Sequence, residues 1–149
     1  MNRDFKERMS MLLKNLKQQK ACYGVLQQLL ELQKRAIKER NDEALMAAIK
    51  DKNVQIQTLH RLEQEFNRLI GELNGEQKES AEQQTQSLRQ EIVRALESLI
   101  EAENACQHAL IQETEELKQQ MVEFKKKKNL FKGYNDPSSS KGGGFSGNV

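Results

Sequence analysis

Residues 43–75 read EALMAAIKDKNVQIQTLHRLEQEFNRLIGELNG, and this stretch decides the fold class. Its apolar residues recur at alternating steps of four and three, the spacing of one face of an α-helix. The positions on that face are Leu45, Ile49, Lys52, Ile56, Leu59, Glu63, Phe66, Ile70 and Leu73. Leu62 and Leu69 widen the face. The pattern predicts a long amphipathic helix that packs against other helices, with two charged residues inside the stripe.

A similar pattern precedes this stretch, and it predicts a first helix from about Asn2 to Arg40. Its apolar spine is Phe5, Met9, Leu12, Leu16, Tyr23, Leu26, Leu30 and Ile37, while Gln19 and Gln33 fill two further positions. Gly24 costs this helix about 1 kcal/mol relative to Ala, and we interpret it as a tolerated glycine, the alternative being a close approach of another helix. Asn41-Asp42-Glu43 interrupts the periodicity, so a tight turn with a capping residue is expected near Arg40–Asp42.

A third helix is predicted after the second. Asn74-Gly75 is interpreted as the end of the second helix, and Ser80-x-x-Gln83 as a capping box that opens the third. The third spine is Leu88, Ile92, Ala95, Leu99, Ala102, Cys106, Leu110, Leu117, Met121 and Phe124. A helix from Ser80 to about Phe131 is roughly 78 Å long, against about 50–58 Å for each of the first two. The third helix is therefore expected to be longer than its partners can cover.

These segments predict an all-α fold, an elongated antiparallel three-helix coiled-coil-like bundle with a disordered C-terminal tail, with more than 70% helix. Residues 1–131 form the helical domain, and residues 132–149, rich in Gly and Ser, form a flexible tail. In the expected core, side chains of the second helix pack on side chains of the first and third helices. The second helix contributes Leu45, Ile49, Ile56, Leu59, Phe66 and Ile70, the first contributes Leu12, Leu16, Leu26 and Leu30, and the third contributes Leu88, Ile92 and Leu99.

Charge is distributed unevenly along the 149 residues, although the formal net charge is only +2. Three Lys/Arg against ten Asp/Glu give residues 76–117 a net charge of −7, and seven against two give residues 118–149 a net charge of +5. Lys125–Lys128 could suggest nucleic-acid binding. A solvated helix end explains these lysines better, because they complement the helix dipole and no aromatic residues are interleaved for base stacking. No nucleic-acid partner is expected.

Residues with catalytic or metal-binding chemistry form no recognisable constellation. His60 and His108, the only histidines, have no second ligand at helical spacing, and Cys106 and His108 are two residues apart, so their side chains diverge on a helix. The glycine cluster 142–144 lacks the strand–loop–helix context of a phosphate loop. The sequence predicts a protein that is not an enzyme and has no metal and no cofactor. Two isolated cysteines, without an expected signal peptide or membrane span, favour the cytoplasm.

Several short stretches resemble the FlgN family of flagellar type III export chaperones. Leu29-Leu30-Glu31-Leu32 followed by Asn41-Asp42-Glu43-Ala44-Leu45 looks like the family's first hairpin, and Lys52 to Leu69 looks like its second helix. Leu99-x-x-x-Glu103-Asn104 before Leu110-Ile111 is similar to its long third helix, and Lys132-Gly133-Tyr134-Asn135 to its tail. The chain departs from the family where Gln107 and His108 follow in place of a second asparagine, and in its polyglycine extension.

The resemblance implies a cytosolic chaperone that binds hook-associated (hook–filament junction) proteins and delivers them to the flagellar export apparatus. Peripheral contact with the membrane would arise only through that apparatus. We expect Leu110, Leu117, Met121 and Phe124 to form the client-binding stripe, because the first two helices are too short to cover them, or alternatively to pack within the chain or close a homodimer. The resemblance also implies that Tyr134 docks on the cytoplasmic export-gate protein. Two other classes stay open, a structural coiled-coil homo-oligomer and a chaperone of another type III secretion system.

Overall fold

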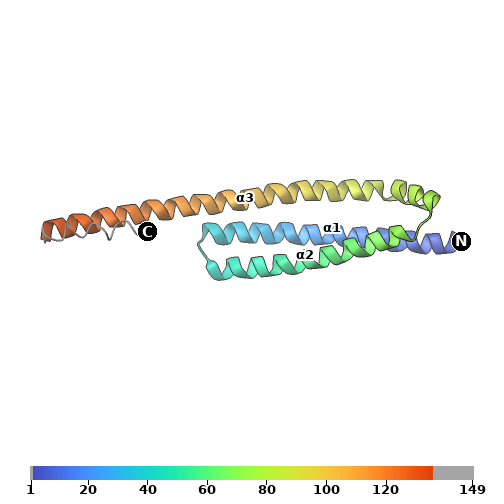
Figure 1. Ribbon diagram of the computed structural model, residues 1–149, viewed down its shortest axis with the longest axis horizontal. Helices are drawn as coiled ribbons and strands as arrows, with labels where there is room; N and C mark the ends of the chain where they lie inside the picture. The colour runs from blue at the N-terminus through green and yellow to red at the C-terminus, as the bar shows by residue number, and fades with distance from the viewer. Residues whose placement is uncertain (1, 136–149) are drawn as a thin grey trace. The chain divides into compact units, whose positions relative to one another are not determined.

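The computed structural model describes residues 2–135, and the side chains of residues 3–133. Three helices account for most of this range, namely α1 (Asn2–Lys38), α2 (Asp42–Gly71) and α3 (Gly75–Asn135) (Figure 1). They contain 37, 30 and 61 residues of a 149-residue chain, so the prediction of more than 70% helix is confirmed. The described range contains no strand. The predicted tail falls mainly on residues 136–149, which lie outside the described residues.

The chain divides into two compact units, residues 1–109 and residues from 110 onward. In the first unit, α1 and α2 form an antiparallel hairpin, and the part of α3 up to Ala109 runs antiparallel to α2 (Figure 1). This is the three-helix arrangement that the apolar periodicity predicts. The described part of the second unit consists of the remaining residues of α3, up to Asn135.

The turn between α1 and α2 lies where the sequence predicts it. Arg40 adopts a left-handed conformation with φ of 54°, which directs the Asn41 N–H to the Ala36 carbonyl at 2.9 Å and the Arg40 N–H to the Ile37 carbonyl at 3.2 Å. These two bonds complete a Schellman-type end for α1. Asn41 then caps α2, because its Oδ1 accepts a hydrogen bond of 3.1 Å from the Ala44 N–H.

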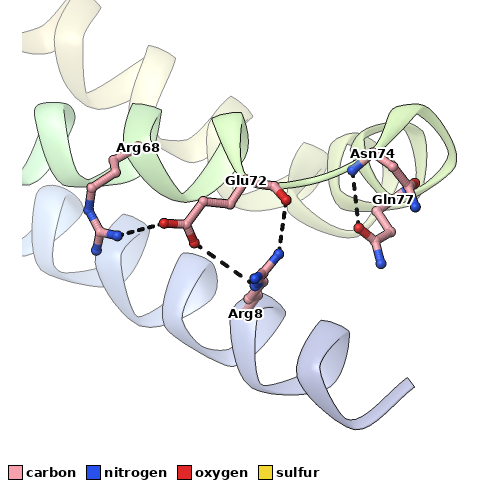
Figure 2. A network of polar contacts seen from close by, with 5 residues as sticks. All are labelled: Arg8, Arg68, Glu72, Asn74 and Gln77. Atoms are coloured by element: carbon pink, nitrogen blue, oxygen red, sulfur yellow. Dashed lines mark hydrogen bonds and ion pairs between the residues drawn. The ribbon is translucent and has the colours of Figure 1, made fainter. Parts of the chain in front are cut away.

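The start of α3 differs from the prediction. Asn74 does not end α2; its Oδ1 accepts from the Gln77 N–H at 2.9 Å, and the Asn74 N–H donates to Gln77 Oε1 at 3.1 Å (Figure 2). This reciprocal pair is a capping box, so α3 begins at Gly75 and the prediction of a box at Ser80-x-x-Gln83 is wrong. The same pattern, with Asn in place of Ser, occurs six residues earlier, and the residues between are compatible with helix.

An arginine pair fixes the end of α2 against α1. Arg8 of α1 donates from Nη1 to the Glu72 carbonyl at 2.9 Å, and its Nε lies 3.9 Å from Glu72 Oε2. Arg68 of α2 contacts the other carboxylate oxygen, with Nη1 to Oε1 at 2.8 Å (Figure 2). A carbonyl that has no partner within the helix is thereby satisfied, which is one of the requirements at a helix C-terminus.

Three buried clusters follow one another along the first unit. The first cluster is nearest the N-terminus of α1 and contains Met9, Leu12, Leu69, Leu73 and Ala81. The middle one contains Leu16, Cys22, Tyr23, Leu26, Leu59 and Ile92. The third, near the α1–α2 turn, contains Leu30, Ile37, Cys106 and Ala109. Each cluster includes residues of α1 and α3, so both helices contribute to the core along its whole length.

The predicted core is confirmed with a few shifts. Most predicted residues are buried or pack on the three clusters, whereas Ile49 is half-buried and belongs to none of them. Leu69, which the periodicity placed at the edge of the stripe, is one of the three most completely buried large side chains. Ala81 is also buried, so the part of α3 that packs in the core begins before Leu88, where the predicted spine starts.

Two amide side chains lie inside the apolar seam of α1. Asn15 donates from Nδ2 to the Leu62 carbonyl of α2 at 2.9 Å, and Gln19 donates from Nε2 to Asn15 Oδ1 at 2.7 Å. Both residues are buried. A buried amide that is satisfied only in one alignment of two helices favours that alignment over shifted ones.

Gly24 is a tolerated glycine rather than a point of close approach. A Cβ atom at this position would have no atom within 4 Å beyond its own helix backbone and its chain neighbours. The structure therefore supports the simpler of the two interpretations of this residue, and its cost to α1 is one of helix propensity alone.

We predict that Leu59→Ala lowers the free energy of unfolding by about 2–4 kcal/mol, because Leu59 is only 7% exposed in the middle cluster. Urea unfolding followed by circular dichroism measures this change. Val54→Ala is the matched control on the same helix, since Val54 is 53% exposed; it should change stability by less than about 0.5 kcal/mol. Equal effects of the two substitutions would contradict the described core.

We also predict that Arg40→Gly raises the free energy of unfolding by about 0.5–1 kcal/mol, because glycine adopts the left-handed conformation at Arg40 without a Cβ clash. Arg40→Ala is the control. It removes the same side chain but keeps the strained backbone, so the difference between the two variants isolates the conformational effect. A glycine variant no more stable than the alanine variant would show that the turn is not left-handed at residue 40.

Candidate functional site

Four apolar side chains of the second unit are exposed on α3. Leu110, Leu117, Met121 and Phe124 have exposed fractions of 53%, 46%, 44% and 64%. None of them belongs to a buried cluster. These are the four residues that the sequence predicts as a client-binding stripe, and in the structure their side chains are exposed on the surface of α3.

The four residues share one face of the helix. Their separations of seven, four and three residues bring them back to the same side, since each residue of an α-helix rotates by about 100°. Phe131 lies seven residues beyond Phe124 and is 65% exposed, so it extends the face by two further turns. The predicted stripe ends at Phe124, although the same spacing in the sequence continues to Phe131.

Other apolar residues of this segment are exposed on different faces. Ile111 and Val122 each follow a stripe residue directly, so they are turned away from it by about 100°, and both are more than half exposed. Leu130 is exposed as well. The segment is therefore apolar on more than one side, and Ile111 and Val122 provide a natural comparison for the stripe.

Charged residues flank the stripe in two blocks of opposite sign. Glu113, Glu115 and Glu116 lie near its beginning, and Lys125–Lys128 and Lys132 lie near its end. Glu115 Oε1 lies 3.9 Å from Lys118 Nζ on the same helix, with both side chains largely exposed. An exposed pair of this kind adds little stability, so such charges can exchange partners at small cost.

Tyr134 lies in the last turn of α3, which continues to Asn135. The sequence predicts that residues 132–135 belong to the tail, whereas in the structure they are part of the helix. The side chain of Tyr134 is outside the described residues, so its role in export-gate docking stays a prediction.

The two cysteines are buried and their sulfur atoms are poor nucleophiles. Burial raises the pKa of both the Cys22 and the Cys106 thiols, and the Cys106 thiol donates to the Leu30 carbonyl at 3.3 Å. A thiol held in its neutral form reacts slowly. His60 Nδ1 lies 3.7 Å from Glu63 Oε2 on the surface of α2. Within the described residues no group of His, Cys, Asp and Glu side chains is arranged to hold a metal ion.

None of the described helices is long and apolar enough to cross a membrane. Within the described residues, the three-helix core and the exposed apolar face on α3 define the class of an all-helical, coiled-coil-like protein. The family model of the FlgN protein matches residues 9–84, about half of the chain. The chain therefore belongs to the FlgN family, a family of flagellar export chaperones. No curated protein and no solved structure matches the chain.

The matched residues cover most of α1, all of α2 and the first turns of α3. The hairpin and second-helix stretches that resemble the family lie inside this range. The stretches Leu99–Ile111 and Lys132–Asn135 lie outside it, as do the exposed stripe and Tyr134. Family membership therefore rests on the hairpin, and the roles of the α3 residues need support from their own geometry.

Proposed function

We propose that this chaperone binds hook-associated proteins in the cytosol and delivers them to the flagellar type III export apparatus. Family membership supports a role in flagellar export, and the exposed stripe Leu110, Leu117, Met121 and Phe124 is the observation that carries the client-binding part. An amphipathic helix with an unoccupied apolar face is the surface that a second amphipathic helix needs.

The composition of the stripe suits a client that is bound and later released. Methionine adapts its shape to different apolar partners, and Met121 lies in the middle of the stripe. A contact that buries about 1,000 Å² in total is at the lower end of specific interfaces, and ordering costs reduce its affinity further. Such binding keeps a client soluble and lets the export apparatus take it over.

A double substitution tests the client surface. Leu117→Glu with Met121→Glu places two charges in the centre of the stripe, so we expect client binding to be lost while the helix content stays unchanged, because both side chains are exposed. Titration calorimetry with a purified hook-associated protein measures the binding, and circular dichroism measures the helix content.

The matched control is Ile111→Glu with Val122→Glu, which adds the same charge to residues that are also exposed but lie on another face. This variant should bind the client with an affinity within about threefold of the original protein, a difference of less than 1 kcal/mol. Undiminished binding by the Leu117/Met121 variant would exclude the stripe as the client site.

Tyr134 is proposed to dock on the cytoplasmic export-gate protein. A tyrosine ring fills an apolar groove at small entropic cost, and the neighbouring Lys125–Lys128 and Lys132 would speed the encounter with an acidic surface. Tyr134→Ala should leave client binding intact, weaken gate binding and slow export of the junction proteins. Tyr134→Phe retains the ring and should keep most of the function. Normal secretion and gate binding by the alanine variant would refute this role.

A further inference from the structure

A pocket opens between α2 and α3 in the first unit. Phe66 of α2 and Val93 of α3 line its two sides, and the buried Leu16 of α1 also contributes to the lining. Further along the two helices, Lys52 of α2 reaches Glu103 of α3, with Nζ to Oε1 at 3.4 Å. We call the surface from this pocket to the Lys52–Glu103 pair the α2–α3 face.

The α3 side of this face carries exposed apolar residues. Val93, Leu96 and Ile100 are 51%, 37% and 60% exposed. Leu96 lies seven residues after Arg89, which lines the pocket, and seven before Glu103, which contacts α2, so it lies on the same side of α3. Val93 and Ile100 are three and four residues from Leu96 and adjoin it on the helix surface. The face is about 21 Å long between Arg89 and Glu103.

Charged side chains at the pocket are held on their own helices. Arg89 donates from Nη2 to the Glu82 carbonyl at 2.8 Å and from Nε to Thr85 Oγ1 at 3.1 Å. On the other side of the pocket, Glu63 Oε2 lies 3.7 Å from His60 Nδ1 of the same helix. These contacts run along each helix, so the apolar residues between α2 and α3 stay accessible.

The border of the α2–α3 face is acidic. Glu63 lines the pocket, and its side chain is 43% exposed. Glu97 is exposed and lies four residues after Val93 and three before Ile100, so it borders these apolar residues. In residues 90–102, one Arg against three Glu gives a net charge of −2. This border favours a partner whose own apolar surface is flanked by basic residues.

We propose that the α2–α3 face binds an amphipathic helix of the client, with Lys or Arg residues beside its apolar stripe. The stripe packs between Phe66 of α2 and Val93, Leu96 and Ile100 of α3, and the basic residues lie beside the acidic border. This is the helix-in-groove mode of recognition. The identity of the partner as the client rests on the proposed function, and the site is a second one, in the first unit.

Two helices contact a partner on more sides than one helix does. The stripe from Leu110 to Phe124 lies on α3 alone within the described residues, whereas the α2–α3 face has apolar residues on both of its helices. A client held at both sites gains affinity without a stronger contact at either, because the second contact forms within the complex. Loss of the α2–α3 contact should therefore weaken binding even while the stripe is intact.

Two valines of nearly equal exposure test the site. Val93→Glu should weaken binding of a purified hook-associated protein at least about tenfold, since it places a charge against an apolar surface; Ile100→Glu should do the same. The control is Val54→Glu, because Val54 is 53% exposed and is turned about 200° from Ile56, which packs on the middle cluster. It should bind within about threefold of the original protein. Titration calorimetry measures the affinity, and circular dichroism checks the helix content.

The acidic border is tested by a second matched pair. Glu63→Lys should weaken client binding about fivefold at low salt, and this difference should shrink at about 1 M salt, where the Debye length is about 3 Å. Glu65→Lys is the control, because Glu65 is exposed and two residues along the helix turn it away from Glu63 by about 200°. It changes the net charge by the same amount and should leave the affinity unchanged.

The outcomes separate this site from the proposed function. Full client binding by the Val93 and Ile100 variants, together with loss of binding by the Leu117/Met121 variant, would overturn the α2–α3 site and leave the function intact. A client that does not bind the original chain would overturn both. Equal weakening by Val54→Glu would also exclude the site. If sedimentation shows that the original chain dimerises and that Val93→Glu alone prevents this without changing client affinity, the face binds a second copy instead.

Discussion

The fold depends on a continuous apolar seam that α1, α2 and α3 share. Leu59 of α2 packs in one cluster with Leu16 and Leu26 of α1 and Ile92 of α3, and the clusters at either end repeat this arrangement. An isolated helix is only marginally stable in water, and packing of its apolar face supplies most of its stability. Each helix of the first unit is therefore stabilised by its contacts with the other two. The first part of α3 packs on the hairpin that α1 and α2 form.

Polar residues inside the seam give the packing its register. Asn15 and Gln19 form a buried chain of hydrogen bonds from α1 to the Leu62 carbonyl of α2. Lys52, a charged residue within the apolar stripe of α2, reaches Glu103 of α3 with Nζ to Oε1 at 3.4 Å. A helix shifted by one turn would leave the buried Asn15 and Gln19 amides without these partners, and a buried unpaired polar group costs more than the bond itself contributes.

The family assignment and the candidate surface come from different parts of the chain. The hairpin and the first turns of α3 carry the match to the FlgN family. The exposed stripe begins at Leu110, just after Ala109, the last residue of the third buried cluster. The apolar spacing of α3 continues across this point, so the same periodicity builds the core in one unit and an open surface in the next.

The sequence by itself determined the helical class, the first turn and most of the core, because apolar spacing and capping residues act locally along the chain. It misplaced the start of α3, since Asn74-x-x-Gln77 and Ser80-x-x-Gln83 are both plausible capping boxes and only the folded chain selects between them. It also could not separate Cys106 from Leu110, which occupy equivalent positions in one pattern. Cys106 is buried and Leu110 is exposed, because burial depends on which other helix lies opposite, and that is decided by the tertiary structure.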